Sequence, residues 1–326
     1  MTTLVTGGAG FIGSHLVDYV LAETADDVIV FDDFSTGRSG NLDHLDDDRV
    51  QVREGDVRDA ESVRAAVEDA TVVYHLAAAV GVQNVVENPL SSLRTNLAGT
   101  ENVLDAAAET GTPTFVASSS EVYGKSPDVP FSEDDDRVIG PTSTTRWGYA
   151  TAKAADEFLA LAYHEEVDLP VVVGRFFNIV GPRQSGRYGM VIPTFVEQAL
   201  AGDPLTVYGD GTQTRSFTHV EDAVRAVYEL TNTTSAHGDV FNVGEPEPTS
   251  INDLARRVVD LTGSDAEITH VPFEEVYGPD FEEPDRREPD VTKLRETIGW
   301  APEADLDRIL RDVIEARSER EVRIDA

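Results

Sequence analysis

The sequence predicts an α/β fold, in which a doubly wound parallel sheet is accompanied by a smaller C-terminal α/β lobe. Two observations favour this fold class. In the first half of the chain, short apolar segments that could be buried on both faces of a sheet alternate with segments of helical periodicity. Beyond about residue 178 the pattern changes to loops punctuated by Pro and Gly, with scattered helices. We therefore expect two unequal lobes that divide near residue 175.

The elements of the first lobe follow in chain order. Strands are predicted at residues 4–6, 28–31, 50–52, 71–76, 114–118 and 170–174, and a helix at residues 11–22 joins the first two. The second lobe is expected to contain helices at residues 191–201 and 251–262. A helix at 222–230 and a strand at 240–244, both within about residues 218–245, are expected to return to the first lobe.

The chain is strongly acidic. Among its 326 residues, 61 are Asp or Glu and 26 are Lys or Arg, which gives a formal net charge of −35. Such a surface repels nucleic acid and anionic membranes, so neither is expected as a partner. The acids are dispersed along the chain and lysine is scarce, as in proteins of halophilic microbes. We therefore expect folding and activity to need roughly molar salt, which would screen the self-repulsion.

Other features of the sequence indicate where the protein acts and which kinds of site it can carry. No apolar run of about 18 residues and no basic segment followed by an apolar one is present, so we expect a soluble cytoplasmic protein. The absence of cysteine excludes disulfides and thiolate metal sites. His75 and His219 lack a spaced set of further ligands and are expected to be core histidines. No metal site is predicted.

A glycine-rich turn joins the first predicted strand to the first helix. Gly7, Gly10 and Gly13 lie in residues 6–14, where glycine lets the backbone turn tightly and approach a pyrophosphate. The start of the following helix would then stabilise the negative charge. The turn therefore predicts a dinucleotide site, and its contacts are predicted to be Gly7, Gly10, Phe11, Ile12 and Gly13.

Acidic residues follow the next two strands. Asp32 ends the second strand, 19 residues after Gly13, where a carboxylate would accept hydrogen bonds from the adenosine ribose. It would also repel a 2′-phosphate, so the predicted cofactor is NAD and not NADP. Asp33 is an alternative for the same role. Asp56, next to Val57, ends the third strand and is interpreted either as an adenine ligand or as a helix cap.

Tyr149 and Lys153 are spaced for joint action. On a helix, residues i and i+4 share a face, so the phenol and the ammonium would point into the same space. A phenol with a pKa near ~10 is a poor base at neutral pH, and a neighbouring cation favours its phenolate form. The pair predicts a proton-transfer centre.

Taken together, these motifs resemble the extended short-chain dehydrogenases/reductases that act as nucleotide-sugar epimerases, dehydratases and decarboxylases. The matching segments, in order, are residues 6–14, 75–78, 95–100, 118–124, 149–153, 175–178, 205–217 and 294–302. The resemblance implies a Rossmann domain that binds NAD at residues 1–175 and a nucleotide-sugar lobe at residues 176–326. It also implies that the NAD channel is lined by Leu76, Ala77, Ala78, Asn96, Ser118 and Phe176.

The resemblance assigns roles to the candidate catalytic residues. In this family hydride passes from the sugar's C4 to NAD while a tyrosinate takes the hydroxyl proton. By motif alignment Tyr149 is the base, Ser119 relays or positions the proton, and Lys153 lowers the tyrosine pKa and holds the nicotinamide ribose. Glu121 is also counted among the predicted catalytic residues. Degenerate relatives that only sense NAD usually lose the tyrosine, the lysine or the glycines, and all are intact here.

The residues after Ser119 separate the subfamilies. Dehydratases carry Asp-Glu there, whereas this chain has Ser120-Glu121, as UDP-glucuronate decarboxylases typically do. Residues 145–149 also resemble a bacterial decarboxylase. In contrast, residues 181–184, Tyr188 and residues 191–193 resemble UDP-sugar epimerases. Because epimerisation needs the fewest extra groups, the sequence narrowly favours a 4-epimerase of UDP-glucose or a UDP-hexuronate. A UDP-glucuronate decarboxylase comes second and a dTDP- or UDP-glucose 4,6-dehydratase third.

The resemblance also implies a substrate clamp and a homodimer. Tyr208 would stack on a uracil, and Arg215 would hold the diphosphate. Arg287 aligns both with an arginine on the diphosphate of epimerases and with a proposed proton donor of decarboxylases. The remaining predicted contacts to the sugar nucleotide are Ser119, Asn178 and Arg187. The dimer is expected to form through helices near residues 96–109 and 149–164.

Overall fold

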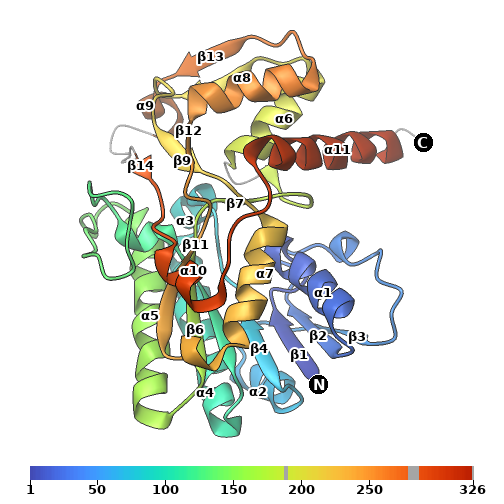
Figure 1. The fold of residues 1–326 in the computed structure, drawn as a ribbon, viewed down its shortest axis with the longest axis vertical. Helices are drawn as coiled ribbons and strands as arrows, with labels where there is room; N and C mark the ends of the chain where they lie inside the picture. Colours follow the sequence, from blue (N-terminus) through green and yellow to red (C-terminus); the bar gives the residue numbers. More distant parts are fainter. Residues whose placement is uncertain (187–189, 278–285, 325–326) are drawn as a thin grey trace.

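The computed structural model describes residues 1–186, 190–277 and 286–324, which form two lobes (Figure 1). The larger lobe is built on a seven-stranded sheet in the order β11-β6-β5-β4-β1-β2-β3, with every neighbouring pair parallel. Its strands are β1 (Thr2–Thr6), β2 (Asp27–Asp32), β3 (Val50–Glu54), β4 (Val72–His75), β5 (Thr114–Ser119), β6 (Val171–Phe176) and β11 (Asp239–Val243). This sheet confirms the predicted fold class.

The order of strands reverses beside β1. The chain runs outward from β1 through β2 to β3, and then crosses back to β4 on the other side of β1. Ligands of such sheets bind outside the carboxyl ends of the strands at this reversal. The glycine turn follows β1, and Leu76 follows β4, so both predicted cofactor segments begin there. The N-terminus lies at the end of the sheet away from the second lobe, so the strands' carboxyl ends face that lobe (Figure 1).

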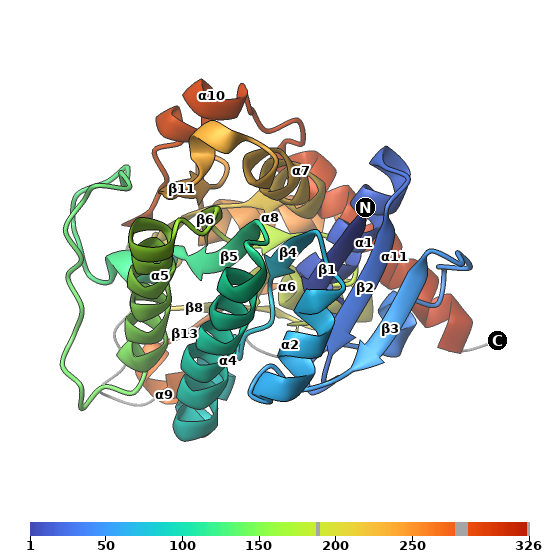
Figure 2. The same cartoon turned by 90° about the horizontal axis from the view of Figure 1, so that it is seen from below.

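Helices cover both faces of the sheet (Figure 2). One face is covered by α1 (Phe11–Glu23) and α7 (Val220–Thr231), the other by α2 (Ala60–Glu68), α4 (Pro89–Thr110) and α5 (Trp147–Val167). Successive strand residues point to opposite faces, so Val5 packs in the first core and Leu4 in the second. Both faces are therefore apolar, which explains the unbroken apolar runs of the strands.

The second lobe is centred on α6 (Val191–Ala201), α8 (Ile251–Thr262) and α11 (Leu306–Ile324), which share a separate apolar core. Its short strands are β7 (Ile179–Val180), β8 (Leu205–Tyr208), β9 (Thr214–Ser216), β10 (Thr218–His219), β12 (Pro248–Ser250), β13 (Ile268–Val271) and β14 (Arg286–Arg287). They pair as β10-β7, β12-β9-β14 and β13-β8. The short helices of the two lobes together are α3 (Val82–Glu87), α9 (Phe273–Tyr277), α10 (Thr292–Ile298), η1 (Ser39–Asn41), η2 (Ser120–Tyr123) and η4 (Thr234–Ala236).

The predicted elements and the observed ones differ mainly at their ends. The helices at 191–201 and 251–262 have the predicted bounds, while most strands of the large sheet are one or two residues longer than predicted. The helix and strand expected at 222–230 and 240–244 are α7 and β11, and β11 forms an edge of the large sheet. Within the described part of the chain, no helix is long and apolar enough to span a bilayer.

Candidate active site

The glycine turn is packed too closely for a side chain at several of its positions, including Gly7 and Gly13. Gly7 has φ +71°, and a Cβ there would lie 2.8 Å from the Ala77 backbone nitrogen. A Cβ on Gly13 would lie 2.2 Å from the Gly7 carbonyl oxygen. Gly10 is the N-cap of α1 and brings no side-chain cap, and the first turn of α1 holds no acid. The turn therefore fits a pyrophosphate, which the backbone N–H groups at the start of α1 would bind.

Of the two acids after β2, Asp32 is the one tied to this turn. Its carboxylate accepts hydrogen bonds from the backbone N–H groups of Ala9 and Phe34, both at 2.9 Å. Asp32 is buried, and burial raises its pKa above the ordinary value, opposed by these two bonds. Asp33 is exposed and bonds Ser35. This geometry favours Asp32 over Asp33 as the predicted ribose ligand.

Asp56 does not act as a helix cap. It forms an ion pair with Arg58, which holds the pKa of the Asp56 carboxyl below its usual range. The cap of α2 is instead Asp59, whose carboxylate accepts from the backbone N–H groups of Glu61 and Ser62. Val57 is buried beside Asp56. The adenine contact predicted for Asp56 remains a prediction, and the cap interpretation is wrong.

Apart from Asn96, which lies on α4, the predicted channel residues lie at or just after the carboxyl ends of neighbouring strands. Leu76, Ala77 and Ala78 follow β4 and are half-buried. Asn96 on α4 accepts from the Ala79 backbone N–H at 2.8 Å and donates to its carbonyl at 3.3 Å, so it fixes the shape of this segment. The remaining two lie on β5 and β6, where Ser118 donates to Glu157 at 2.5 Å and the Phe176 ring packs against Phe115.

The structure brings Ser119 and Tyr149 together. Their side chains are hydrogen-bonded, and the Ser119 hydroxyl oxygen also accepts from the Glu121 backbone N–H at 3.3 Å. The sequence led us to expect a lowered tyrosine pKa. In the structure the pKa of Tyr149 is raised, first by burial and then by the negative charge of Glu121, while the bond to Ser119 opposes the rise. The ammonium of Lys153 donates to the Ala117 carbonyl at 3.0 Å and to Asp156 at 3.2 Å.

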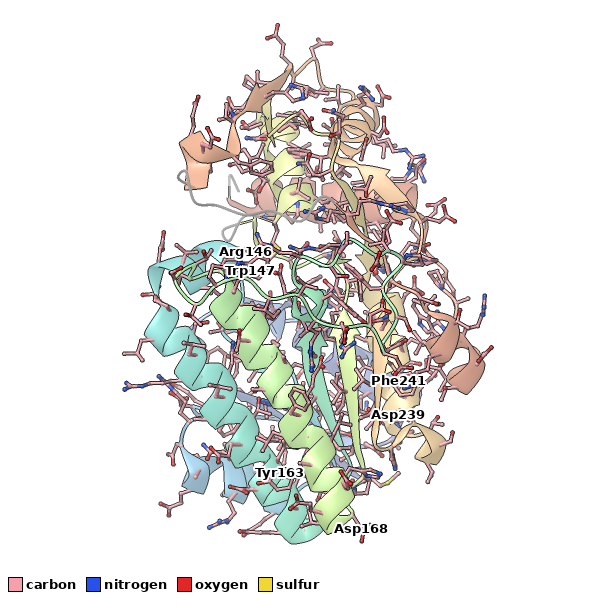
Figure 3. The ribbon with its side chains drawn as sticks, turned by 90° about the vertical axis from the view of Figure 1, so that its left-hand side faces the viewer. Arg146, Trp147, Tyr163, Asp168, Asp239 and Phe241 are labelled. Carbon is pink, nitrogen blue, oxygen red and sulfur yellow. The ribbon has the colours of Figure 1, made fainter. Side chains whose placement is uncertain are left out.

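Glu121 is held between two arginines beside this pair. Arg287 donates to one carboxylate oxygen at 2.5 Å, and Arg146 approaches the other at 3.3 Å. The exposed fractions of the three side chains are 15% for Glu121, 10% for Arg287 and 3% for Arg146. Arg146 precedes α5 and lies over the Trp147 ring, at the end of α5 that faces the second lobe (Figure 3). Glu121 therefore has two cationic partners from different parts of the chain.

Arg287, whose carboxylate partner is Glu121, also has a cationic neighbour. It lies on β14, where its register partner on β9 is Arg215. Both arginines are buried, and Arg215 donates to the Thr214 carbonyl at 2.7 Å. Glu121 already offsets part of the charge of Arg287, and two adjacent buried guanidinium groups could in addition bind the oxygens of an anionic ligand in a bidentate way.

The other predicted substrate residues are distributed around these strands. Asn178, at φ +40°, donates to the Ser216 carbonyl at 2.8 Å and so ties its own loop to β9. Tyr208 is half-buried at the end of β8. Arg187 lies outside the described residues, as does Tyr188. Arg183, shortly before Arg187 in the chain, pairs with Asp18 on α1.

The two histidines considered as metal ligands are buried in the core. The two ring nitrogens of His75 form hydrogen bonds, Nδ1 with the Thr6 hydroxyl at 2.8 Å and Nε2 with the Thr100 hydroxyl at 3.2 Å. His219 caps α7 by accepting from the Glu221 N–H. Among the residues that the structure describes, no group of His, Cys, Asp and Glu is arranged to hold a metal ion.

Three charged residues of the site region were missed in sequence. Arg146 and Asp156 lie on the same helical stretch as Tyr149 and Lys153, and their spacing of three residues from them was a usable signal. Glu157 forms a buried bidentate ion pair with Arg175 at 2.8–2.9 Å. No sequence pattern indicates that pair, because its members come from different elements.

Comparison with known proteins identifies the family. The family model described as GDP-mannose 4,6 dehydratase matches residues 4–313. The chain belongs to the nucleotide-sugar epimerase/dehydratase family. The enzyme is 43% identical over 313 residues to a UDP-N-acetyl-alpha-D-glucosaminuronate decarboxylase of Bacillus cytotoxicus, with 96% of each chain covered. It is 36% identical to UDP-glucuronic acid decarboxylase 4 of Arabidopsis thaliana, over 94% of this chain and 66% of that protein.

Solved structures give the same family. The UDP-glucuronic acid 4-epimerase of Bacillus cereus, in complex with UDP-glucuronic acid and NAD, matches with a TM-score of 0.88 and 29% identity over 98% of this chain and 100% of the other. The epimerase Mth375 of Methanothermobacter thermautotrophicus matches with a TM-score of 0.90 and 30% identity over 99% and 94%. The enzyme is thus an NAD-dependent enzyme that modifies nucleotide sugars, and NAD is its cofactor.

Proposed function

We propose that the enzyme decarboxylates a UDP-hexuronate, either UDP-glucuronate or its 2-acetamido analogue. The observation that supports this most directly is the contact of Glu121 with Arg287 beside the Ser119–Tyr149 pair. The relatives named above that share the most sequence with it are described as decarboxylases of these two sugars. The decarboxylase is therefore placed before the 4-epimerase, which the sequence alone had narrowly favoured.

The first step uses Tyr149 and its neighbours. Bound NAD would supply the hydride acceptor for oxidation at C4 of the sugar and, once reduced, the hydride donor for the final reduction. Tyr149 takes the proton of the C4 hydroxyl, and Ser119, hydrogen-bonded to it, orients that hydroxyl. Because Tyr149 has its pKa raised by burial and by Glu121, it would need the positive charge of Lys153 to act as a base near neutral pH.

The second step follows from the chemistry of the oxidised sugar. A ketone at C4 places a carbonyl two bonds from the C6 carboxylate, so the C5–C6 bond can break with release of CO₂ and its electron pair enters the enolate of the C4 ketone. C5 must then gain a proton before C4 is reduced. The guanidinium of Arg287 would stabilise the negative charge on the enolate oxygen, and the proton that C5 gains would come from solvent admitted beside the Glu121–Arg287 contact.

The arginines account for binding of the anionic substrate. Arg215 and Arg287 are adjacent on β9 and β14, and bidentate guanidinium groups suit both diphosphate and carboxylate oxygens. In a chain of net charge −35, buried cations at the substrate site supply attraction that the surface does not. A bound hexuronate would compete with Glu121 for Arg287.

A UDP-hexuronate 4-epimerase is the second candidate. It is favoured by the fold of the Bacillus cereus 4-epimerase, which was solved with UDP-glucuronic acid. In that reaction Arg287 would bind only the diphosphate, and C5–C6 would stay intact. The two candidates share the first step and differ in the fate of the C6 carboxylate.

The test is to incubate the purified enzyme with NAD and, separately, UDP-glucuronate, UDP-N-acetylglucosaminuronate and UDP-glucose. Release of CO₂ with a UDP-pentose product is expected from a uronate. An intact C6 carboxylate with inverted C4 would refute the decarboxylase and support the epimerase.

Variants sharpen the test. Glu121→Gln and Arg287→Lys should each reduce CO₂ release by at least about 100-fold, since each removes a group near the reacting carbons. Arg286→Lys is the matched control, because Arg286 is next in the chain but its side chain is 55% exposed and pairs with Glu288. An Arg286→Lys loss as large as that of Arg287→Lys would contradict the assigned role.

A further inference from the structure

A buried carboxylate lies against the lysine of the active site. Tyr149, Lys153 and Asp156 occupy positions i, i+4 and i+7 of α5, which place them along one face of the helix. The Lys153 ammonium lies 3.2 Å from Asp156, and the exposed fractions of the two side chains are 3% and 1%. The roles assigned above to Tyr149 and Lys153 do not use this carboxylate, so its presence calls for a separate explanation.

Asp156 is also the end of a chain of buried hydrogen bonds. The Thr100 hydroxyl on α4 bonds the Asp156 carboxylate, and its oxygen lies 3.2 Å from His75 Nε2. His75 Nδ1 lies 2.8 Å from the Thr6 hydroxyl, and the Ala77 backbone N–H donates to the same hydroxyl at 3.3 Å. The chain therefore runs from the segment after β4, past β1, to the carboxylate beside Lys153.

The direction of every bond in this chain is determined. An ionised carboxylate has no proton to donate, so Thr100 donates to Asp156 and its oxygen must accept from His75 Nε2–H. His75 Nδ1 then carries no proton and accepts from the Thr6 hydroxyl, whose oxygen accepts from the Ala77 N–H. This requires neutral His75, and burial lowers the His75 pKa to about 3, with help from the charge of Lys153. All donors point toward Asp156, so the chain stabilises its negative charge.

The charges around the Tyr149 phenol come from several elements. Glu121 on η2 and Asp156 on α5 both raise its pKa. Burial raises the Asp156 pKa as well, but the Lys153 ammonium and the Thr100 hydroxyl oppose that rise. The charged or titratable groups that face this region are Glu121, Arg146 and Arg287 around the carboxylate of η2, and His75, Lys153 and Asp156 around the ammonium.

We propose that Asp156 is a positioning residue that holds the Lys153 ammonium, offsets its charge, and so sets the pH at which Tyr149 becomes a phenolate. The proposal rests on the role proposed above for Tyr149. The helix backbone rises by about 10 Å over seven residues, and we take this value as the order of magnitude of the distance between the two charges. Removal of one negative charge at that separation, with an effective permittivity of about 20, lowers a phenol pKa by on the order of one pH unit.

The test follows the ionisation of Tyr149 directly. In the full chain saturated with NAD, the Cζ carbon of ¹³C-labelled tyrosine is titrated by NMR, and the Tyr149 signal is assigned by its loss in Tyr149→Phe. Asp156→Asn should lower the Tyr149 midpoint by about one pH unit. Glu165→Gln, which removes an exposed carboxylate from the same helix, should leave it unchanged. An unchanged or raised midpoint in Asp156→Asn would overturn the proposal.

Two further measurements keep the proposal testable. If Asp156→Asn does not fold, Asp156→Ala removes the same charge with a residue that favours helix, and the same fall in midpoint is expected. The ¹⁵N shifts of His75 should show a proton on Nε2 and none on Nδ1, and the opposite tautomer would refute the bond directions. None of these readouts depends on which sugar is turned over. A failed decarboxylase assay therefore leaves this test intact, and a failed titration leaves the proposed reaction intact.

Discussion

Replacement of His75 should remove a defined part of the enzyme's sensitivity to acid. His75 is 1% exposed, and burial followed by the charge of Lys153 lowers its pKa from 6.5 to about 3. Between these two values the unfolded chain binds a proton at this histidine and the folded chain does not. The free energy of unfolding therefore falls as the pH falls below 6.5, and above 6.5 this histidine has no effect on the pH dependence.

The magnitude follows from the two pKa values. Each pH unit between 6.5 and about 3 corresponds to about 1.4 kcal/mol, so His75 lowers the stability at pH 4.5 by about 3 kcal/mol relative to neutral pH. His15, whose pKa burial lowers to about 4, contributes with the same sign. In His75→Gln the contribution of His75 disappears. The variant should also lose about 1–3 kcal/mol at every pH, because glutamine cannot make both hydrogen bonds of the imidazole.

Urea unfolding at fixed molar KCl, from pH 4.5 to 7.5, measures this difference. The slope of unfolding free energy against pH should be about 1.4 kcal/mol per unit smaller in His75→Gln than in the parent below pH 6. His270→Gln, at an exposed histidine, should keep the parental slope. Equal slopes in the parent and His75→Gln would refute the buried neutral histidine.

Three other outcomes are expected. Gly13→Ala should weaken NAD binding, measured by calorimetry, by at least about 100-fold, because its Cβ would lie 2.2 Å from the Gly7 carbonyl oxygen and distort the turn; tight binding would exclude the assigned pyrophosphate site. We propose a homodimer through α4 and α5, where the Phe158 side chain is 62% exposed. Phe158→Glu should therefore give monomers in analytical ultracentrifugation, whereas the control Val52→Glu, also at an exposed residue, should not. A dimeric Phe158→Glu would place the interface elsewhere. With a net charge of −35, the melting temperature should rise by more than about 10 °C from dilute buffer to 2 M KCl, and a flat response would contradict the predicted salt dependence.

Local pattern was enough for the architecture of the first lobe. Apolar runs separated by helical segments predicted the strands of the large sheet, and the glycine turn was correctly expected to follow the first strand. The helices at 191–201 and 251–262 were predicted at their observed bounds because their periodicity is strong and glycine follows each. The small sheets of the second lobe were not predicted, since their strands of two to four residues carry too little pattern.

The site was predictable where its residues are neighbours in the chain. Gly7, Gly13, Tyr149 and Lys153 were predicted from their spacing together with the order of the surrounding motifs, because a turn or one helix face determines their geometry. The ranking of epimerase over decarboxylase used the same local motifs, and those do not reveal the contact between Glu121 and Arg287, which are 166 residues apart. The balance of charge at Tyr149 likewise depends on residues from several elements.

The sequence by itself determined the fold class, the glycine turn after β1 and the spacing of Tyr149 and Lys153 on one helix face, because each depends on local sequence pattern or backbone geometry. Only the tertiary structure decided the electrostatics of that pair. Burial and the charge of Glu121 raise the pKa of Tyr149, and Asp156 forms an ion pair with Lys153. These contacts join residues of β5, η2, α4 and α5. The strength of a charge interaction depends on the distance between the charged groups and on their burial, and the spacing of residues in the sequence gives neither quantity.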